Sequence, residues 1–470
     1  MICVTTQKKA GIPMDINEFF ADETPRQPNP RRRQRNYRKE QLRTYGILAA
    51  VAVLILLFIL FAAGSIKRSN AKREAARQES IAVMESSLAE KAAWDKEAEI
   101  LLAEASAVAA GYDYEKAMAM IEGFSGSYYE YDALANLMDT CKRDKEKLVA
   151  WSDPTAIKNL SFNVLIADPD RAFADKENAN SYRKNFITVS EFTNMLTQLH
   201  ANGYVLVNPE DFIEATATEG GVITYTNKPI LLPEGKKPIM LTQTQVNYYG
   251  YMVDGNDDGT PDKEGAGFAN RLVLDANGNL TCQMIDRSGN TVTGAYDMVP
   301  ILNTFLKAHP DFSYRGARAI VAVSGYDGIL GYRGDDLAQA KPIVEALRRD
   351  GYTVACYTYG NIAYGSASLK RLQEDLDNWQ TQIAPVLSTD VLVYAKNSDL
   401  EAYSGEKFDA LTKAGFRFFL GICNNHESWL QMNSTYVRQG RILVNGANLE
   451  HNAYLYTGLF DPASMEDPSR

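Results

Sequence analysis

Histidine is scarce in this sequence. Only four of the 470 residues are histidines, at positions 200, 309, 426 and 451, and no two of them are three to five positions apart. The H-x-x-x-H pair that supplies two ligands to a zinc ion is therefore excluded. Five cysteines are widely and irregularly spaced without a C-x-x-C pair, which excludes a zinc knuckle and a disulfide framework. We expect small, buried thiols at these positions.

Two motifs of common enzyme classes are absent as well. The sequence has no P-loop and no G-x-S-x-G, so Ser324 in VSGYDG is not a nucleophile elbow. With 45% hydrophobic and 23% charged residues, the composition is that of an ordinary globular protein, which excludes a wholly disordered or collagen-like chain. The length allows about two to four domains.

The charge is unevenly distributed. Residues 1–44 hold ten Lys and Arg against five Asp and Glu, whereas the whole chain carries a net charge of -10. The rest of the chain is therefore acidic, which argues against nucleic acid as a partner. We expect the basic head to orient the chain in a membrane and to contact anionic lipid.

A long apolar run follows this head. Gly46 to Ile66 contains 21 residues without a charge, and about 20 helical residues cross a bilayer. The run is too long for the core of a signal peptide, so we interpret residues 45–66 as an uncleaved signal anchor. More Lys and Arg precede the run than follow it, which places the N-terminus inside. We predict a single-pass plasma-membrane protein with residues 1–44 as a disordered cytoplasmic tail and an extracellular main domain.

A helical stalk is predicted for residues 67–151. Lys67–Ala110 has no Gly or Pro and favours helix. Gly111 ends it, Asp113 caps a second helix over Tyr114–Ile121, and Tyr128–Trp151 is expected to form a third helical stretch. The pattern is similar to one TPR-like helical pair. We interpret the stalk as a spacer, with a docking hairpin for another envelope protein as the alternative.

Residues 155–470 alternate short apolar runs with helical periods, which predicts a parallel sheet covered by helices. Seven such units are enough to close a distorted barrel, whose chemistry would lie at the carboxyl ends of the strands. The expected strands are Phe162–Ala167, Pro238–Thr242, Ala319–Ser324, Thr353–Tyr359, Val391–Tyr394, Phe416–Ile422 and Arg441–Asn445. The expected helices are Phe186–Ala201, Met298–Lys307, Leu337–Arg349, Ser368–Ile383 and Glu406–Lys413.

Two of these strands end in polar segments, Thr242-Gln243-Thr244-Gln245 and Tyr357-Thr358-Tyr359-Gly360-Asn361. In these segments and in the order of strands and helices around them, residues 162–467 resemble the polysaccharide deacetylases. These are carbohydrate esterases with the NodB-homology fold. The resemblance implies an α/β fold with a distorted (β/α)7 barrel, preceded here by one transmembrane helix and the α-helical stalk. It also implies a base and a metal ligand as adjacent aspartates, and two histidines in H-[ST]-x-x-H.

This sequence departs from the family at all four of those positions. The base position holds Thr244, and the metal positions hold Gln245, Tyr357 and Asn361. Neutral amides and a phenol do not offset the dehydration of a divalent ion, and a threonine is no general base at neutral pH. We therefore predict an inactive pseudoenzyme with no cofactor at the former zinc site. The alternative is an active deacetylase or hydrolase with a rearranged site.

The strand ends would still line a groove. Amides, hydroxyls and aromatic rings suit uncharged sugars, so we predict binding of cell-wall polysaccharide or peptidoglycan. The alternatives are an inert, filled groove and an interaction module that acts through the stalk. Besides the four replaced positions, the candidate groove residues are Gln243, Tyr359, Asn424, Asn425, His426 and Trp429.

An acidic segment between the expected strands fits a calcium loop. Asp254, Asn256, Asp258 and Asp262 offer oxygen ligands at relative positions 1, 3, 5 and 9, and Gly259 stands at position 6. Position 12 is a glycine rather than the usual glutamate, so any calcium would be structural and weakly bound. The alternative is a solvated acidic turn. Residues 275–279 read as a hairpin turn.

Overall fold

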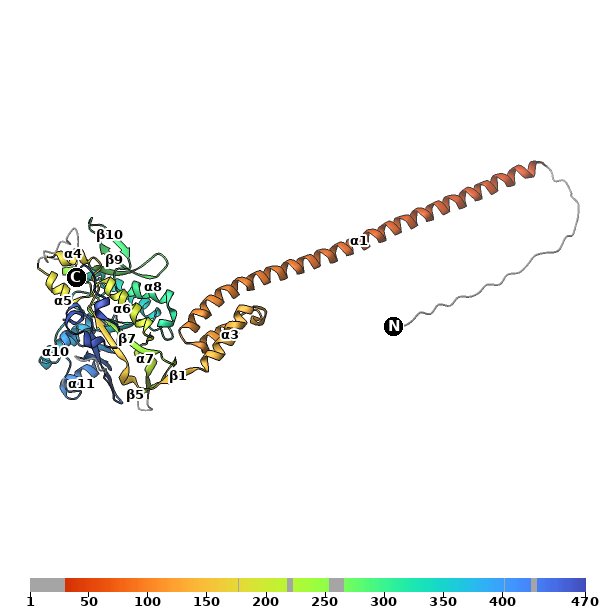
Figure 1. Ribbon diagram of the computed structural model, residues 1–470. Coiled ribbons are helices and arrows are strands. Elements are labelled where there is room, and N and C mark those ends of the chain that lie inside the picture. The colour runs from red at the N-terminus through yellow and green to blue at the C-terminus, as the bar shows by residue number, and fades with distance from the viewer. Residues whose placement is uncertain (1–29, 176, 218–222, 253–265, 401, 424–428) are drawn as a thin grey trace. The chain divides into compact units, whose positions relative to one another are not determined.

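The computed structural model describes residues 30–470, apart from 176, 218–222, 253–265, 401 and 424–428 (Figure 1). The chain divides into two compact units, Met1–Ala92 and Ala93–Arg470. The first contains most of helix α1 (Pro30–Ala110). α1 is the one helix among the described residues that is long and apolar enough to cross a membrane, and its apolar side chains between Ile47 and Phe61 are exposed.

Helix α1 begins earlier than expected. Its first residue is Pro30, so the helix already includes residues 30–44 of the expected tail. Proline fits the first turn of a helix because its missing N–H has no helical partner there. No further proline or glycine follows before Gly46, and the helix continues through the expected stalk segment Lys67–Ala110.

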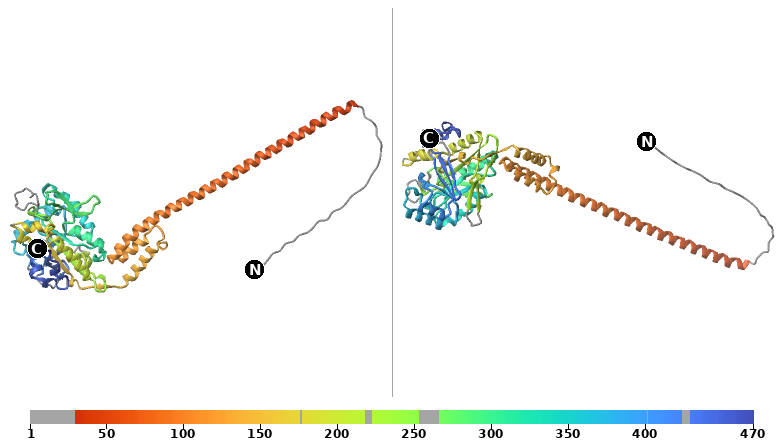
Figure 2. Two further views of the ribbon diagram at one scale, coloured as in Figure 1. Left: turned by 45° about the horizontal axis from the view of Figure 1, so that its top comes forward. Right: turned by 90° about the horizontal axis from the view of Figure 1, so that it is seen from below.

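Within the second unit, the last turns of α1 pack against α2 (Tyr114–Glu122) and α3 (Asp132–Lys145), as both views of Figure 2 show. The predicted cap is confirmed, since Asp113 accepts a 3.4 Å hydrogen bond from the backbone N–H of Lys116. The prediction of helix up to Trp151 was wrong. Residues 148–151 form strand β1 (Leu148–Trp151), which pairs with β6 (Ile230–Pro233), so tertiary pairing overrides local helix propensity.

The predicted seven-strand barrel is confirmed. The parallel strands follow the order β11-β12-β13-β14-β16-β2-β7, and β7 pairs with β11 to close the ring. Two expected strands were shifted, because β2 ends at Phe162 and β16 begins at Val437. The barrel strands are β2 (Lys158–Phe162), β7 (Lys237–Gln243), β11 (Ile320–Val323), β12 (Thr353–Cys356), β13 (Val391–Val393), β14 (Phe418–Ile422) and β16 (Val437–Leu443).

Helices surround the barrel close to where the sequence predicts them. The last turn of the expected helix Ser368–Ile383 is π-helical from Trp379 onward. The covering helices are α4 (Pro169–Ala174), α5 (Ala179–Asn185), α6 (Val189–Ala201), α7 (Pro209–Phe212), α8 (Met298–Ala308), α9 (Lys341–Arg349), α10 (Leu369–Asn378), α11 (Glu406–Lys413) and α12 (Gly446–His451).

Alternate strand residues face two separate cores. Along β7, Ile239 and Leu241 pack toward the helices, whereas Met240 belongs to the cluster inside the barrel. A polar layer follows inside, where Thr242 donates a 2.8 Å hydrogen bond to Asn159, and Asn159 donates one of 3.2 Å to Gln439. The described cysteines, at 141, 282, 356 and 423, are buried thiols outside any disulfide, as predicted.

Several further strands were not predicted. A three-stranded antiparallel sheet has the order β10-β9-β8, and its first turn is the predicted hairpin at residues 275–279. β3 and β15 extend the barrel sheet, and β4 pairs with β5. These strands are β3 (Tyr204–Leu206), β4 (Ile213–Ala217), β5 (Ile223–Asn227), β8 (Ala269–Leu274), β9 (Leu280–Ile285), β10 (Thr291–Gly294) and β15 (Leu430–Met432).

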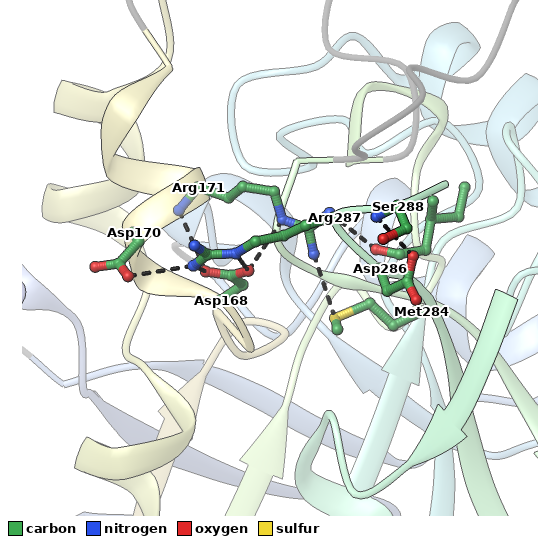
Figure 3. Close-up of polar contacts among 8 residues, drawn as sticks. Asp168, Asp170, Arg171, Met284, Asp286, Arg287 and Ser288 are labelled. Carbon is green, nitrogen blue, oxygen red and sulfur yellow. Dashed lines mark hydrogen bonds and ion pairs between the residues drawn. The ribbon is translucent and has the colours of Figure 1, made fainter. Parts of the chain in front are cut away.

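Ion pairs fasten the three-stranded sheet to α4 (Figure 3). Arg287, in the β9–β10 turn, lies 2.6 Å from a carboxylate oxygen of Asp168 and 3.2 Å from one of Asp170. Arg171 also pairs with Asp168, and it donates to the backbone oxygen of Ile285 at 2.9 Å. The sheet therefore lies beside the loop that follows β2, at the carboxyl end of the barrel.

Acid is expected to weaken these ion pairs between the three-stranded sheet and the start of α4. The Arg287 guanidinium holds the pKa of Asp168 below its ordinary value. The unfolded chain keeps a value of about 3.9, so the stabilisation is complete above that pH and is lost as the pH falls through the lower folded-state value. Arg287→Gln should slightly lower the urea midpoint at pH 7, and this difference should shrink toward about pH 3. An equal difference at both pH values would contradict the assignment. Lys370→Gln, at an exposed lysine of α10, is the control.

Candidate functional site

The carboxyl end of the barrel is built from loops that are tied to one another. The side chain of Asn247, after β7, accepts a 2.9 Å hydrogen bond from the backbone N–H of Ser324 and donates one of 2.7 Å to its oxygen. Ser324 directly follows β11. The loop after β12 is tied to the loop after β11, because Gly325 and Tyr326 both donate backbone hydrogen bonds to the backbone oxygen of Tyr359. The three loops therefore form one rigid surface.

Asn163 gathers two of the predicted site residues. Its side-chain oxygen accepts hydrogen bonds from the Thr244 hydroxyl at 2.8 Å and from the Gln245 amide at 3.1 Å. Thr244 is buried, and Gln245 has a left-handed backbone with φ of 60°. Asn163 itself was not predicted. It directly follows β2, so a correct end for that strand would have pointed to it.

Gln243 lies outside the groove. Its side chain is fully buried and donates a 2.6 Å hydrogen bond to Asp297, the residue before α8. Asp297 also accepts from the backbone N–H of Leu165 at 3.0 Å and from the Tyr248 hydroxyl at 2.8 Å. Burial raises the pKa of Asp297 despite these donors. The structure thus places Gln243 between barrel and helices, one residue out of phase with Thr244, which corrects its assignment to the groove.

Asp375 shapes the loop after β12. Its buried carboxylate accepts hydrogen bonds of 2.7 Å each from the backbone N–H groups of Tyr359 and Gly360 and from the Tyr364 hydroxyl. These bonds hold a loop whose Thr358 and Asn361 have left-handed backbones, with φ of 58° and 48°. Asp375 comes from α10, so helix and loop are locked together.

Tyr357 and Asn361, the two predicted site residues in this loop, differ in environment. Tyr357 is buried inside the barrel, where burial raises the pKa of its hydroxyl. That hydroxyl accepts a 3.4 Å hydrogen bond from the backbone N–H of Lys396. The side-chain oxygen of Asn361 is also buried, and it has no hydrogen-bond partner among the described residues. An unmet buried acceptor costs about 1–3 kcal/mol. The oxygen has almost no solvent contact, so a ligand donor would reach it only after the Asn361 side chain turned outward.

An exposed aromatic ring lies beside this loop. Tyr326 is 52% exposed and stacks on buried Tyr249, with ring centroids 5.4 Å apart and an interplanar angle of 24°. The hydroxyl of Tyr249 is within 2.7 Å of the Ser324 hydroxyl, which fixes its ring. The predicted groove residue Tyr359 donates to Gln382 at 2.8 Å. Tyr326 was missed, although its place in the loop that follows β11 could have pointed to it.

A buried cation lies at the same end of the barrel. Arg441, in β16, is 2% exposed and donates to the Ser161 hydroxyl at 2.8 Å, to the Gly421 oxygen at 3.0 Å and to the Tyr394 oxygen at 3.2 Å. All three partners are neutral, and burial lowers the pKa of Arg441 to about 10. The guanidinium thus joins the ends of β2, β14 and β13. Nothing in its local sequence marks it for this place.

The remaining predicted residues are only partly described. Trp429 is half-buried, and the guanidinium of Arg438 lies 4.9 Å from the centre of its ring. Arg438 also pairs with Asp399 at 2.9 Å. One face of the Trp429 ring is therefore already covered. Asn424, Asn425 and His426 lie outside the described residues, as do the calcium-loop residues Asp254, Asn256, Asp258 and Asp262.

The residues predicted for the base and metal positions of the resembled family do not fit a zinc ion. Thr244, Gln245 and Asn361 offer neutral oxygens, and the raised pKa of Tyr357 keeps its phenol protonated near neutral pH. Arg441 and Tyr357 lie close enough to affect each other's pKa. A fixed guanidinium near these side chains disfavours a second, divalent cation. These side chains can donate and accept hydrogen bonds, but they do not build a metal centre.

No family model matches the sequence, and no curated protein matches it. Among solved structures, the chain is similar to the deacetylase PplD of Streptococcus pyogenes, in complex with acetate, at 10% identity and a TM-score of 0.34. That alignment covers 67% of this chain and 100% of the other. A polysaccharide deacetylase from Bacillus cereus aligns at 10% identity and a TM-score of 0.32, over 67% of this chain and 70% of that one.

Proposed function

We propose that this chain is a membrane-anchored, exported protein whose barrel binds an uncharged glycan of the cell envelope without hydrolysing it. The observation that carries the proposal is the buried side-chain oxygen of Asn361, which has no partner among the described residues. A sugar hydroxyl is a donor that would satisfy it without bringing a charge. Asp375 holds the backbone N–H groups of Tyr359 and Gly360, so the backbone next to Asn361 is fixed before any ligand arrives.

The exposed ring of Tyr326 supplies the second contact. Sugars present apolar C–H faces that pack on aromatic rings, and Tyr326 is held by its stacking on Tyr249. Backbone hydrogen bonds to Tyr359 place it beside the loop that carries Asn361. One ring and one unpaired acceptor on neighbouring rigid loops form a small platform for a single sugar unit.

The same arrangement supports the absence of hydrolysis. Acyl transfer in this fold's esterases would need a base and a polarising ion, whereas the neutral Thr244 hydroxyl donates a hydrogen bond to Asn163. The apolar run in α1 supports the membrane anchor. Binding of another envelope protein through the stalk and of calcium at residues 254–262 remain further proposals.

Calorimetric titration of the full chain in detergent with a soluble N-acetylglucosamine oligomer tests the binding. Asn361→Gly keeps the left-handed backbone but removes the acceptor, and Tyr326→Ala removes the ring. We expect each change to weaken binding about tenfold, the effect of roughly 1.4 kcal/mol. Tyr326→Phe should bind almost like the wild type, because it keeps the ring.

Tyr129→Ala is the matched control. Tyr129 is 74% exposed and stacks on a second tyrosine, like Tyr326, but it lies in the helical hairpin. Unchanged binding in both the Asn361 and the Tyr326 variants would contradict the proposed site. Acetate release from the same oligomer, measured with and without added zinc, tests the catalytic part, and release by the wild type would restore the alternative of an active enzyme.

A further inference from the structure

We propose that His200, His309 and Asp311 form a zinc site at the amino-terminal end of the barrel, opposite the candidate groove. His200 lies in the last turn of α6, His309 directly follows α8, and Asp311 lies in the short 3-10 turn Pro310–Phe312. Helices of the barrel run antiparallel to its strands, so the ends of α6 and α8 lie where the strands begin. The three residues come from three elements that converge at this point.

The geometry is close to that of a bound ion. One ligand atom from each residue can be chosen so that all three lie within 4.8 Å of one another. The Nε2 atom of His200 is 3.0 Å from both carboxylate oxygens of Asp311, and the two imidazole rings have centroids 4.5 Å apart. Zinc bonds of about 2.0–2.2 Å place tetrahedral ligand atoms roughly 3.4 Å apart, so only a small closure is needed.

The surroundings hold these side chains in position. The ring of His200 makes edge contacts with Phe305 and Phe312, with centroids 6.1 Å and 5.8 Å away. The ring of Phe305 also lies 4.6 Å from that of His309. All three candidate ligands are half-buried. Two histidines and one carboxylate with partial access to solvent are a ligand set that zinc prefers, with water in the fourth position.

One cation competes for the same carboxylate. The Nζ atom of Lys236 lies 3.2 Å from Asp311. The same carboxylate lies 3.0 Å from the Nε2 atom of His200, so it faces both groups at once. The lysine must move aside when a metal ion binds, so its charge should lower the affinity for zinc.

The site lies at the base of the helical hairpin. The hydroxyl of Tyr112 donates a 2.7 Å hydrogen bond to the backbone oxygen of Asp311. Arg315, four residues further on, donates its backbone N–H to the oxygen of Gly111 at 2.8 Å. A zinc ion on Asp311 would stiffen the segment that receives the connection between α1 and α2. We therefore infer a structural role for the ion.

The test uses the full chain in detergent, stripped with a chelator and titrated with zinc against a chromophoric competitor. We expect one bound zinc per chain, with affinity reduced at least about 100-fold in His200→Ala and in His309→Ala. Lys236→Met should bind zinc about tenfold more tightly, because the competing charge is gone. Tighter zinc binding in Lys236→Met is not expected if His200 and Asp311 form only a structural ion pair.

Exposed His451 supplies the control, and His451→Ala should bind like the wild type. Asp311→Asn keeps the side-chain shape and should also lose zinc, and circular dichroism checks that each variant is folded. The wild type should show a higher melting temperature with zinc, and the ligand variants should not. A wild type that retains no zinc, or zinc binding unaltered in both histidine variants, would overturn the proposal.

Discussion

Replacing Asp375 with alanine is expected to destabilise the barrel unit by roughly 4 kcal/mol and to abolish glycan binding. The change leaves two backbone N–H groups and the Tyr364 hydroxyl without their buried acceptor, at about 1–3 kcal/mol each. Left-handed backbone costs about 1–2 kcal/mol per residue without such support. The loop should therefore relax at Thr358 and Asn361, and the unpaired acceptor of Asn361 should leave its place.

Urea unfolding followed by tryptophan fluorescence measures the first effect, since Trp379 on the adjoining π-helical turn is buried and reports on this region. Titration with the N-acetylglucosamine oligomer measures the second. Asp377→Ala, on the exposed side of α10, should change neither quantity. A stable Asp375→Ala variant that still binds the oligomer would show that the hydrogen bonds of Asp375 do not position the site.

Arg470→Ala should cost about 3–5 kcal/mol, the usual effect of leaving a buried charge unpaired. Glu191 is fully buried, and Arg470 approaches its two oxygens at 2.6 and 2.7 Å. Arg470 also donates to the backbone oxygen of Phe186 at 2.9 Å and to that of Arg183. One side chain therefore joins the end of the chain to α5 and to the start of α6.

A double variant separates charge from packing. Combining Arg470→Ala with Glu191→Gln removes the uncompensated carboxylate, and the new side-chain amide oxygen can still accept the backbone N–H of Thr188 that caps α6. We expect the double variant to recover part of the lost stability in a urea titration. If Arg470→Ala alone lowers stability by less than about 1 kcal/mol, the ion pair is worth no more than an exposed one.

Much of the barrel could be predicted because its signals are local. The spacing of Leu372, Leu376 and Trp379 marks a helix face, and a short apolar run such as 418–422 marks a buried strand. The sheet of β8, β9 and β10 was missed, although its first turn was recognised. A register shift between Ala269 and Arg271 breaks the alternation of β8. Arg287, in the β9–β10 turn, pairs with Asp168 across 119 positions, and such a contact is not visible in the sequence.

In the candidate site, too, some residues could be predicted from local sequence, whereas others depend on tertiary contacts. Strand ends located Thr244, Gln245 and Asn361, but the period of two residues along β7 decides that Gln243 faces the helices instead. Arg441 reaches Ser161 across 280 positions of sequence. His200, His309 and Asp311 have no motif spacing, because two helix ends and a turn bring them together. Only tertiary structure reveals partners of this kind.

The pairing of β2 with β16 has a consequence for how this protein is made. The first and last barrel strands are neighbours, and Asn159 contacts Gln439 across 280 positions. At about 5–20 residues per second, a ribosome needs on the order of tens of seconds to synthesise that separation. During this time β2 has no partner on one edge, and its apolar residues invite aggregation. The high contact order also predicts slow refolding. We expect the nascent barrel to depend on chaperones until its last strand is complete.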